Sequence, residues 1–258
     1  MQAPRHQCAH RNVFHCTVQR SGSHWLRAIL SDPRTYEWSG LTRYPLETQF
    51  PQGVDPRKLT ERTFPEPFPA NTILTPLYLD YACFQKIPKP GPYRVVFVHR
   101  DPRDVVVSWY FSVKHSHAAH GEVARIRWQL AEMSSEAGLL YAIDYVEAFG
   151  LFEAQRSWLN ADDPNVLLVR FEEMIAPGGA PVIEQILQHC DIRMPRSVLT
   201  AVLDDYSFTS LSGRLQGDED RNSHYRKGMA GDWRAYFTDR IAARFKEAGG
   251  DMFLETSA

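Results

Sequence analysis

The stretch that decides the fold is residues 13–30, VFHCTVQRSGSHWLRAIL. Residues 13–18 are mostly apolar, which is typical of a strand buried in a parallel sheet. Residues 23–30 are compatible with a helix, and a small turn that contains Gly22 separates the two segments. A strand that passes through a short turn into a helix predicts an α/β fold.

Two more pairs of this kind follow along the chain. Residues 95–99 form an apolar run ahead of a predicted helix at 102–114, and residues 166–169 precede, after a loop, a predicted helix at 180–189. A weaker strand is expected at residues 72–75. Strands that alternate with helices predict a mostly parallel central sheet flanked by helices, in a single P-loop-like domain.

The remaining segments carry weaker signals. Residues 36–70 are rich in proline and aromatic residues and are expected to form an irregular covering loop. Residues 122–160 place apolar side chains three and four residues apart, which predicts helix. These apolar residues include Leu139, Ile143, Val146 and Phe149.

Length and composition fit a packed globular protein. The chain has 258 residues, of which 43% are hydrophobic and 23% charged, so disorder and collagen-like repeats are excluded. No linker-like stretch divides the sequence. We therefore expect one domain over residues 1–258, with residues 1–11 as a loose N-terminal tail.

Charge and cysteine content limit the partners. The 29 Lys and Arg residues nearly balance the 31 Asp and Glu residues, for a formal charge of -2, so we expect neither nucleic acid nor a membrane as partner. No apolar run predicts a secretion signal or a membrane span. The cysteines lack metal-ligand spacing, so no metal is expected, and reduced thiols in a cytoplasm are the expectation. They are Cys8, Cys16, Cys83 and Cys190.

The first candidate site is the turn after residues 13–18. A helix N-terminus presents unpaired backbone N–H groups and the positive end of its dipole to an anion. The Ser21 and Ser23 hydroxyls and the Arg20 guanidinium lie in the same turn, so together they predict a cradle for a phosphate-like group. The alternative is a serine-capped helix that follows a buried strand.

The second candidate site is the sequence VVFVHRDPRD at residues 95–104. Asp101 is predicted as the N-cap of the next helix, Pro102 as its first residue and Asp104 as its third. Arg100 then lies at the carboxyl edge of the sheet, where open α/β folds bind ligands. With Ser108 it is predicted to hold a second phosphate. The alternative is a capping ion pair between Arg100 and Asp104.

The third candidate site is YRKGMAGDW at residues 225–233. Two adjacent cations, Arg226 and Lys227, precede the permissive Gly228, and Trp233 follows. Such a loop is able to close over an anion. The alternative is a surface turn.

Together the three segments resemble a known family. RSGSHWL, HRDPRDVVVSWY and RKGMAGDW, in this order, are similar to the motifs of the cytosolic-type sulfotransferases that use 3′-phosphoadenosine 5′-phosphosulfate (PAPS). The resemblance extends from about residue 13 to about residue 245. It implies an enzyme, a PAPS-dependent sulfotransferase, with PAPS as co-substrate and 3′-phosphoadenosine 5′-phosphate (PAP) as product.

The resemblance also implies roles for single residues. It assigns the 5′-phosphosulfate to the first loop, namely Arg20, Ser21, Gly22, Ser23, His24 and Trp25, with Trp25 also stacking on adenine. It assigns the 3′-phosphate to Arg100, Ser108, Arg226, Lys227 and Gly228. It assigns further adenine contacts to Phe171, Ser207 and Phe208.

The catalytic groups depart from the family pattern. Arg20 stands where the cytosolic enzymes usually have lysine, which is similar to the tyrosylprotein sulfotransferases. The family's KTHLP segment aligns with residues 74–77, so Pro76 replaces its catalytic histidine and Leu74 its lysine. Similarity to the tyrosylprotein enzymes makes Glu37 the candidate base. The rivals are histidines, because imidazole titrates near neutral pH; they are His24, His115, His117 and His120.

These residues bear on three candidate functions. The first is a sulfotransferase that moves a sulfuryl group from PAPS to a hydroxyl of an unidentified small molecule. The second is a protein that binds PAP or PAPS but has lost transfer activity. A P-loop kinase requires a GK[ST] lysine, which does not accompany Arg20. Residues 234–243 depart from the family's dimerisation motif, which leaves the oligomeric state open.

Overall fold

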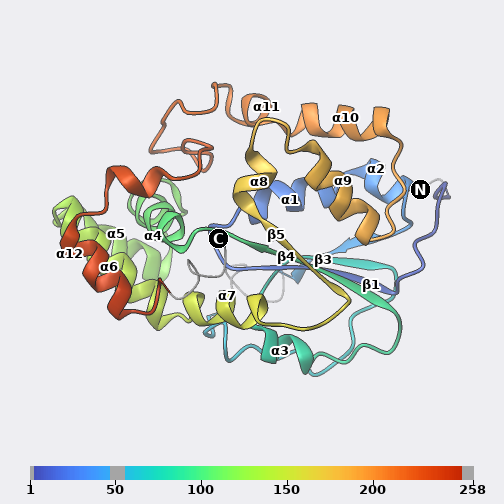
Figure 1. Cartoon of the computed structure of the whole chain (residues 1–258), viewed down its shortest axis with the longest axis horizontal. Helices are drawn as coiled ribbons and strands as arrows, with labels where there is room; N and C mark the ends of the chain where they lie inside the picture. Colours follow the sequence, from blue (N-terminus) through green and yellow to red (C-terminus); the bar gives the residue numbers. More distant parts are fainter. Residues whose placement is uncertain (1–2, 47–55, 252–258) are drawn as a thin grey trace. The chain divides into compact units, whose positions relative to one another are not determined.

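A computed structural model of the chain describes residues 3–46 and 56–251 (Figure 1). The chain groups into two compact units. The first comprises Met1–His99 and Glu153–Ser207, and the second comprises Arg100–Phe152 and Phe208–Ala258. The chain passes between the units three times, so neither unit is one continuous segment.

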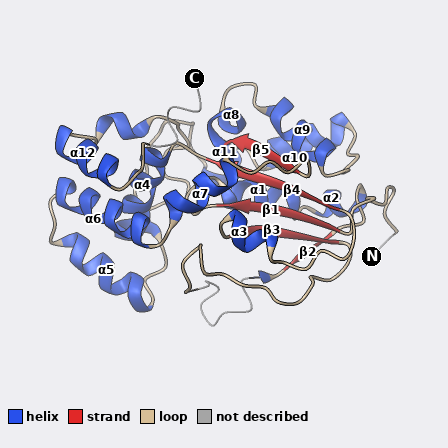
Figure 2. Cartoon of the chain, turned by 60° about the horizontal axis from the view of Figure 1, so that its bottom comes forward, coloured by secondary structure: helices blue, strands red, loops and turns tan. Residues whose placement is uncertain are grey.

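The first unit contains a five-stranded parallel sheet of order β2-β3-β1-β4-β5, drawn red in Figure 2. Its strands are β1 (Asn12–Thr17), β2 (Thr42–Tyr44), β3 (Thr72–Tyr78), β4 (Tyr93–His99) and β5 (Val166–Arg170). Four of them lie where strands were predicted, which confirms the α/β class. The short β2 lies in the segment predicted to be irregular, of which residues 47–55 are outside the described part.

Helices cover both faces of this sheet. They are α1 (Ser23–Leu30), α2 (Pro33–Glu37), α3 (Tyr81–Gln85), most of α7 (Leu151–Leu159), α8 (Phe171–Ile175), α9 (Ala180–His189) and α10 (Arg196–Asp205). In Figure 1, α3 and α7 lie on one face and the others on the opposite face. The predicted helices at 23–30 and 180–189 coincide with α1 and α9.

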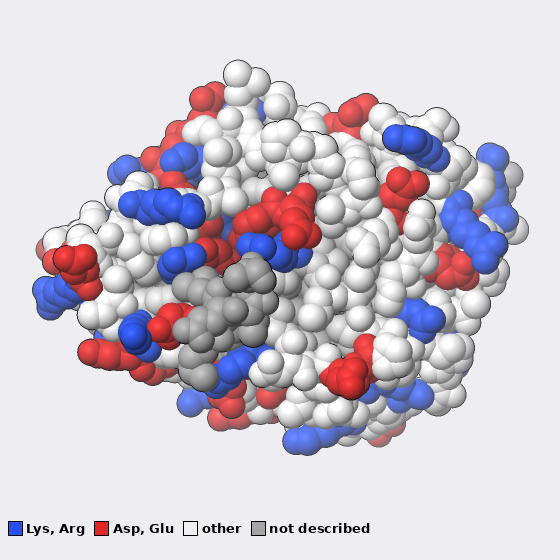
Figure 3. Space-filling view, viewed as in Figure 1, with Lys and Arg blue, Asp and Glu red and all other residues white. Residues whose placement is uncertain are grey.

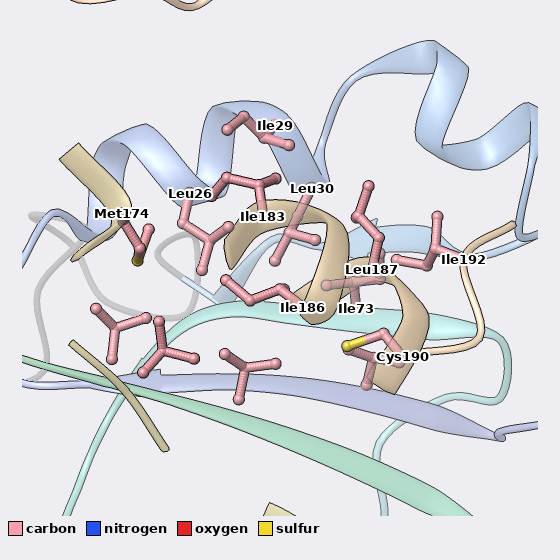
Figure 4. Packing of buried hydrophobic residues seen from close by; sticks show 14 of the residues in the cluster. Leu26, Ile29, Leu30, Ile73, Met174, Ile183, Ile186, Leu187, Cys190 and Ile192 are labelled. Carbon is pink, nitrogen blue, oxygen red and sulfur yellow. The ribbon is translucent and has the colours of Figure 1, made fainter. Parts of the chain in front are cut away.

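The two faces have different cores. On the α1 face, Leu26 and Leu30 pack with Ile183 and Ile186 of α9 in one aliphatic cluster (Figure 4). On the other face the core is aromatic, and Phe97 and Trp158 stack with ring centroids 4.9 Å apart. Fully burying a side chain of this size stabilises the fold by roughly 1.5–3 kcal/mol. These clusters fix β1 and α1, and thereby the turn between them.

The N-terminal residues are bound to the first unit, although a loose tail was expected. The Cys8 N–H donates to the Ser39 carbonyl at 2.7 Å, and the Ala9 N–H donates to the Asp191 carboxylate at 2.8 Å. The Cys8 side chain is buried. Residues 5–9 therefore form an ordered edge of the unit, because burial of Cys8 and these hydrogen bonds hold them in place. All four cysteines are buried free thiols.

In the described residues of the second unit, the regular elements are all helices, and residues 213–231 form a long irregular loop. It contains α4 (Pro102–Phe111), the π-helix η2 (Ser112–Ser116), α5 (Gly121–Ala131), α6 (Ser135–Ala148), α11 (Phe208–Ser212), the 3₁₀ helix η3 (Asp232–Ala235) and α12 (Asp239–Glu247). The segment 122–160, predicted as helical, consists of three helices. Ser134 caps α6, and Gly150, at φ 78°, separates α6 from α7.

The surface charge and the apolar character of the helices are two further features to compare with the sequence. Acidic and basic side chains are interspersed on the face shown in Figure 3. Among the helices of the described ranges, none has the length and apolar character needed to cross a membrane.

Candidate active site

The turn between β1 and α1 has an unusual backbone. Arg20 adopts φ 71° and Gly22 adopts φ 77°, both in the left-handed region. For a residue with a side chain this conformation costs of order 1–3 kcal/mol, and such strain clusters at functional sites. Turns of this kind direct successive backbone N–H groups into a concavity that binds anions. The geometry therefore favours the predicted anion cradle over a simple capped helix.

Glycine is required at position 22 for a second reason. A Cβ atom added there would overlap the ring of Phe171, the first residue of α8. The Phe171 ring is buried against the loop and belongs to the aliphatic cluster of the first unit. Phe171, predicted as an adenine contact, thus supports the loop backbone from beneath.

The two serine hydroxyls of the loop differ in their contacts. Ser21 Oγ is buried, and no hydrogen-bond partner for it lies within residues 3–46 and 56–251. Ser23 Oγ lies 2.8 Å from the phenolic oxygen of Tyr78, the last residue of β3. A buried hydroxyl without a partner is costly unless a ligand satisfies it. The loop therefore fits a polyanionic group such as a phosphosulfate.

Trp25 contacts the segment that contains Ser207. The Trp25 indole N–H donates to the Tyr206 carbonyl at 2.7 Å, and the Tyr206 hydroxyl donates to Asp32 at 3.1 Å. Arg34 bridges Asp32 and Asp205. This network, which the sequence did not reveal, holds Trp25 against the residue that precedes Ser207. His24 follows Ser23 in the first turn of α1 and is partly exposed.

Glu37 does not lie beside the loop. It is the last residue of α2 and forms an ion pair with Arg5 at 2.5 Å, while its carbonyl accepts a hydrogen bond from the Arg5 N–H. Arg5 precedes β1, whereas Arg20 follows it. A strand of this length spans about 20 Å. The structure therefore places Glu37 at the opposite edge of the sheet, because α1 and α2 carry the chain back past the start of β1.

The second unit contains the other predicted anion site. Asp101 caps α4 by accepting from the Arg103 N–H at 2.9 Å, and Pro102 is the first helical residue, which confirms the predicted helix start. The Arg100 guanidinium lies 3.5 Å from the Met229 carbonyl and 4.0 Å from Asp104. The structure thus brings Arg100 to the loop that contains Arg226. Ser108 lies farther along α4.

Asp104 organises this loop. Its carboxylate is buried and accepts hydrogen bonds from the Gly231 N–H at 2.6 Å and the Trp233 N–H at 2.9 Å. The guanidinium of Arg103 stacks over the Trp233 ring at 3.7 Å. The sequence indicated Asp104 as a helix-start residue and as a candidate ion-pair partner of Arg100. Its larger role follows from tertiary contacts that local spacing does not report.

The cations of the RKG segment are already paired with carboxylates. Arg226 forms ion pairs with Asp232 and, at 2.5 Å, with Glu219, and Lys227 binds Asp232 at 2.6 Å. Burial alone would raise the pKa of Asp232, but hydrogen bonds from Lys227 and Arg226 outweigh it and lower that pKa. Gly228 adopts φ 66°, and a Cβ there would overlap the Phe208 ring.

Three of the four rival histidines belong to the second unit, and the fourth, His24, lies in the first. His115 lies in the π-helix, where its ring stacks on Phe111, and burial lowers its pKa. His117 follows that helix, and His120 is the residue before α5. A histidine that the sequence did not single out, His15, is fully buried in β1, and burial lowers its pKa to about 3.

Comparison with known proteins identifies the family. A family model described as "Sulfotransferase domain" matches residues 10–253. The chain belongs to the sulfotransferase family. This confirms the resemblance drawn from the sequence. The match spans residues of both units, and the expectation of a single domain stays a prediction.

Individual relatives are distant. The chain is 28% identical over 171 residues to 3-beta-hydroxysteroid sulfotransferase from Cavia porcellus, a match that covers 59% of this chain and only 53% of that enzyme. It is 23% identical to cytosolic sulfotransferase 16 from Arabidopsis thaliana, over 93% of this chain and 75% of the relative. A mouse sulfotransferase crystallised with PAP shares the fold at 21% identity, with a TM-score of 0.61 over 92% of this chain and 82% of that one.

Proposed function

We propose that this sulfotransferase moves a sulfuryl group from PAPS to a hydroxyl of a small molecule and releases PAP. The observation that carries the proposal is the left-handed loop ahead of α1, with the buried Ser21 hydroxyl, which has no hydrogen-bond partner in the described part of the chain. Family membership supports the reaction class. The name of the guinea pig relative, a hydroxysteroid sulfotransferase, supports a hydroxyl acceptor. Four buried free thiols support a cytoplasmic setting.

In the first unit, the loop would hold the 5′-phosphosulfate. Ser21 and Ser23 offer hydroxyls, and the backbone from Gly22 to Trp25 begins a helix whose dipole favours an anion. In-line transfer of a sulfuryl group needs neutralisation of charge more than covalent help. Arg20 would stabilise the leaving phosphate by hydrogen bonding, because a guanidinium does not give up its proton.

In the second unit, the cations around the RKG segment would hold the 3′-phosphate. Arg100, Arg226 and Lys227 carry the charge, Ser108 adds a hydroxyl, and Gly228 lets the backbone approach closely. The family resemblance assigns adenine contacts to Trp25, Ser207 and Phe208, and Phe171 would support the loop that holds the 5′-phosphosulfate. Glu37 lies near the start of β1, whereas Arg20 follows its end, so Glu37 is not proposed as the base.

A transfer assay tests the proposal. Incubation of the chain with PAPS carrying radiolabelled sulfate, in the presence of a chelator, should label at least one member of a panel of phenols, sterols, aliphatic alcohols and glycans. Calorimetry should show that PAP binds much more tightly than AMP, ADP or ATP, because only PAP fills both anion sites. PAP binding without any transfer would favour the alternative of a binding protein. Equal affinity for PAP and AMP would remove the role assigned to the RKG segment.

A further inference from the structure

Tyr78 occupies a special place in the first unit. It ends β3, and its backbone pairs with Thr17, the last residue of β1, so it lies beside the start of the phosphosulfate loop. Its phenolic oxygen lies 2.8 Å from Ser23 Oγ in the first turn of α1. Arg62 donates to the Tyr78 carbonyl at 2.7 Å and fixes the strand end. The pairing with Thr17 and the hydrogen bond from Arg62 therefore hold the end of β3, and with it the Tyr78 side chain that contacts Ser23.

An irregularity in β3 aims Tyr78 at α1. The register between β1 and β3 shifts opposite Thr75 and Pro76, which is where a proline without an N–H is tolerated in a sheet. After this shift Leu77 is buried in the aromatic core, so Tyr78, one residue on, faces the other side. Pro76, two residues before Tyr78, stands where the family resemblance expects the catalytic histidine. Pro76 and Tyr78 therefore share one face of the strand.

The chemistry of the Tyr78 hydroxyl suits proton transfer without ionisation. Burial raises the pKa of Tyr78, and this outweighs the opposite effects of the Ser23 hydrogen bond and of Arg27, Arg20 and Arg62. A phenol that stays neutral both donates and accepts a hydrogen bond, as does a serine hydroxyl. Two such groups in contact can pass a proton along while neither becomes an ion.

We propose that Tyr78 and Ser23 form a proton relay that replaces the missing histidine. The inference rests on the proposed function. As the acceptor oxygen forms its bond to sulfur and the bond from sulfur to the bridging phosphate oxygen breaks, the acceptor proton passes to Tyr78 Oη. The Tyr78 proton passes to Ser23 Oγ, and the Ser23 proton passes to the leaving phosphate. Each hydroxyl ends as it began, and the proton is carried off on PAP.

The relay predicts a selective loss of activity. Tyr78→Phe removes only the hydroxyl, and a positioned proton acceptor is worth typically 10²–10⁴-fold. We expect kcat for a weakly acidic aliphatic alcohol to fall about 100-fold, at the low end of that range. Transfer to an acidic phenol, whose proton leaves without help, should fall only a few-fold. PAP affinity, measured by calorimetry, should stay within about twofold of wild type because Ser23 remains.

Three further measurements separate a relay from a structural role. Tyr81→Phe makes the same change nearby, at a hydroxyl that bonds Asp163 at 3.3 Å, and should leave both acceptors unaffected. The double variant of Tyr78→Phe and Ser23→Ala should lose no more kcat with the alcohol than Ser23→Ala alone, because one broken link already stops the relay. An ultraviolet difference titration of wild type against Tyr78→Phe, with PAP bound, should show a neutral phenol at pH 7.

The outcomes distinguish failure of the relay from failure of the function. A wild-type chain that transfers sulfate to no acceptor overturns the proposed function and the relay with it. A wild type that is active while Tyr78→Phe loses the same factor with alcohol and phenol overturns the relay alone. A large drop in PAP affinity, or a phenolate at pH 7, also overturns the relay, since Tyr78 would then act on the donor or as a conventional base.

Discussion

The two regions proposed to bind anions in this sulfotransferase are built on different principles. The loop between β1 and α1 offers hydroxyls and backbone N–H groups from a strained turn, with the Ser21 hydroxyl already buried. The RKG segment of the second unit offers full charges, but Arg226 and Lys227 are bound to Asp232 and Glu219. In the first region the backbone already orients the donors, whereas in the second region carboxylates occupy the cations that a phosphate would bind.

This difference separates chemistry from affinity. In the first loop the fold already holds the hydrogen-bond donors in place, so they need not reorient during the reaction. Their contacts can therefore strengthen as charge develops in the transition state. In the RKG segment a phosphate must displace a carboxylate, so each new contact replaces an existing one and the net gain is smaller. Changes in the first loop should therefore alter kcat, and changes in the second region should alter donor affinity.

Arg20→Ala should have the largest effect. Loss of a donor aimed at developing charge typically lowers kcat by about 10²–10³-fold. We expect a kcat reduction of that size, with a much smaller change in PAP affinity, from steady-state kinetics and calorimetry on the same preparation. Arg20→Lys, which restores the family's usual residue, should recover most of the rate. A normal kcat in Arg20→Ala would show that the loop only binds the donor.

Arg226→Ala should have the reverse signature. A hydrogen bond to a charged group is worth roughly 1.5–3 kcal/mol, but Arg226 must give up contacts with Glu219 and Asp232 to bind the phosphate. PAP affinity should therefore fall about 10-fold, at the low end of that range, while kcat at saturating PAPS changes little. AMP, which lacks the 3′-phosphate, should bind both proteins equally. Arg221→Ala is the matched control, because Arg221 also contacts Glu219, at 3.3 Å, but is 56% exposed. An equal loss of AMP affinity would mean that Arg226 supports the fold of the loop.

The sequence predicted both regions because each rests on local patterns. An apolar run, a glycine turn and a helix start are contiguous in residues 13–30, and the strand and helix that result match the expected ones to within one residue. Asp101 and Pro102 likewise mark the start of α4 through short-range capping chemistry. Strands and helix starts of this kind can be predicted because the residues that determine them are neighbours in the sequence.

The missed features depend on distant residues. β2 has only three residues and lies at the edge of the sheet, so it is too short to show the alternation of apolar and polar residues that marks a strand. Asp104 bonds residues more than a hundred positions away, and Tyr78 reaches Ser23 only because the register of β3 shifts. The prediction of Glu37 relied on distance along the chain, which does not reveal that α2 returns the chain to the far edge of the sheet.

Glu219→Gln should have the smallest effect and an opposite sign, which makes it the sharpest test of the comparison. Glu219 is 26% exposed, and its ion pair with Arg226 must open when a phosphate takes its place. A partly exposed ion pair is worth about 0.2–1 kcal/mol, so its removal should tighten PAP binding by up to about fivefold. AMP affinity should not change, and the gain in PAP affinity should shrink at high salt, which screens the ion pair.

Asp218→Asn is the matched control, because it removes the same charge one residue away, at an exposed side chain, and so reports the effect of net charge alone. Weaker PAP binding in Glu219→Gln would show that the carboxylate positions Arg226 for the phosphate instead of competing with it, and the contrast between the two regions would then be wrong.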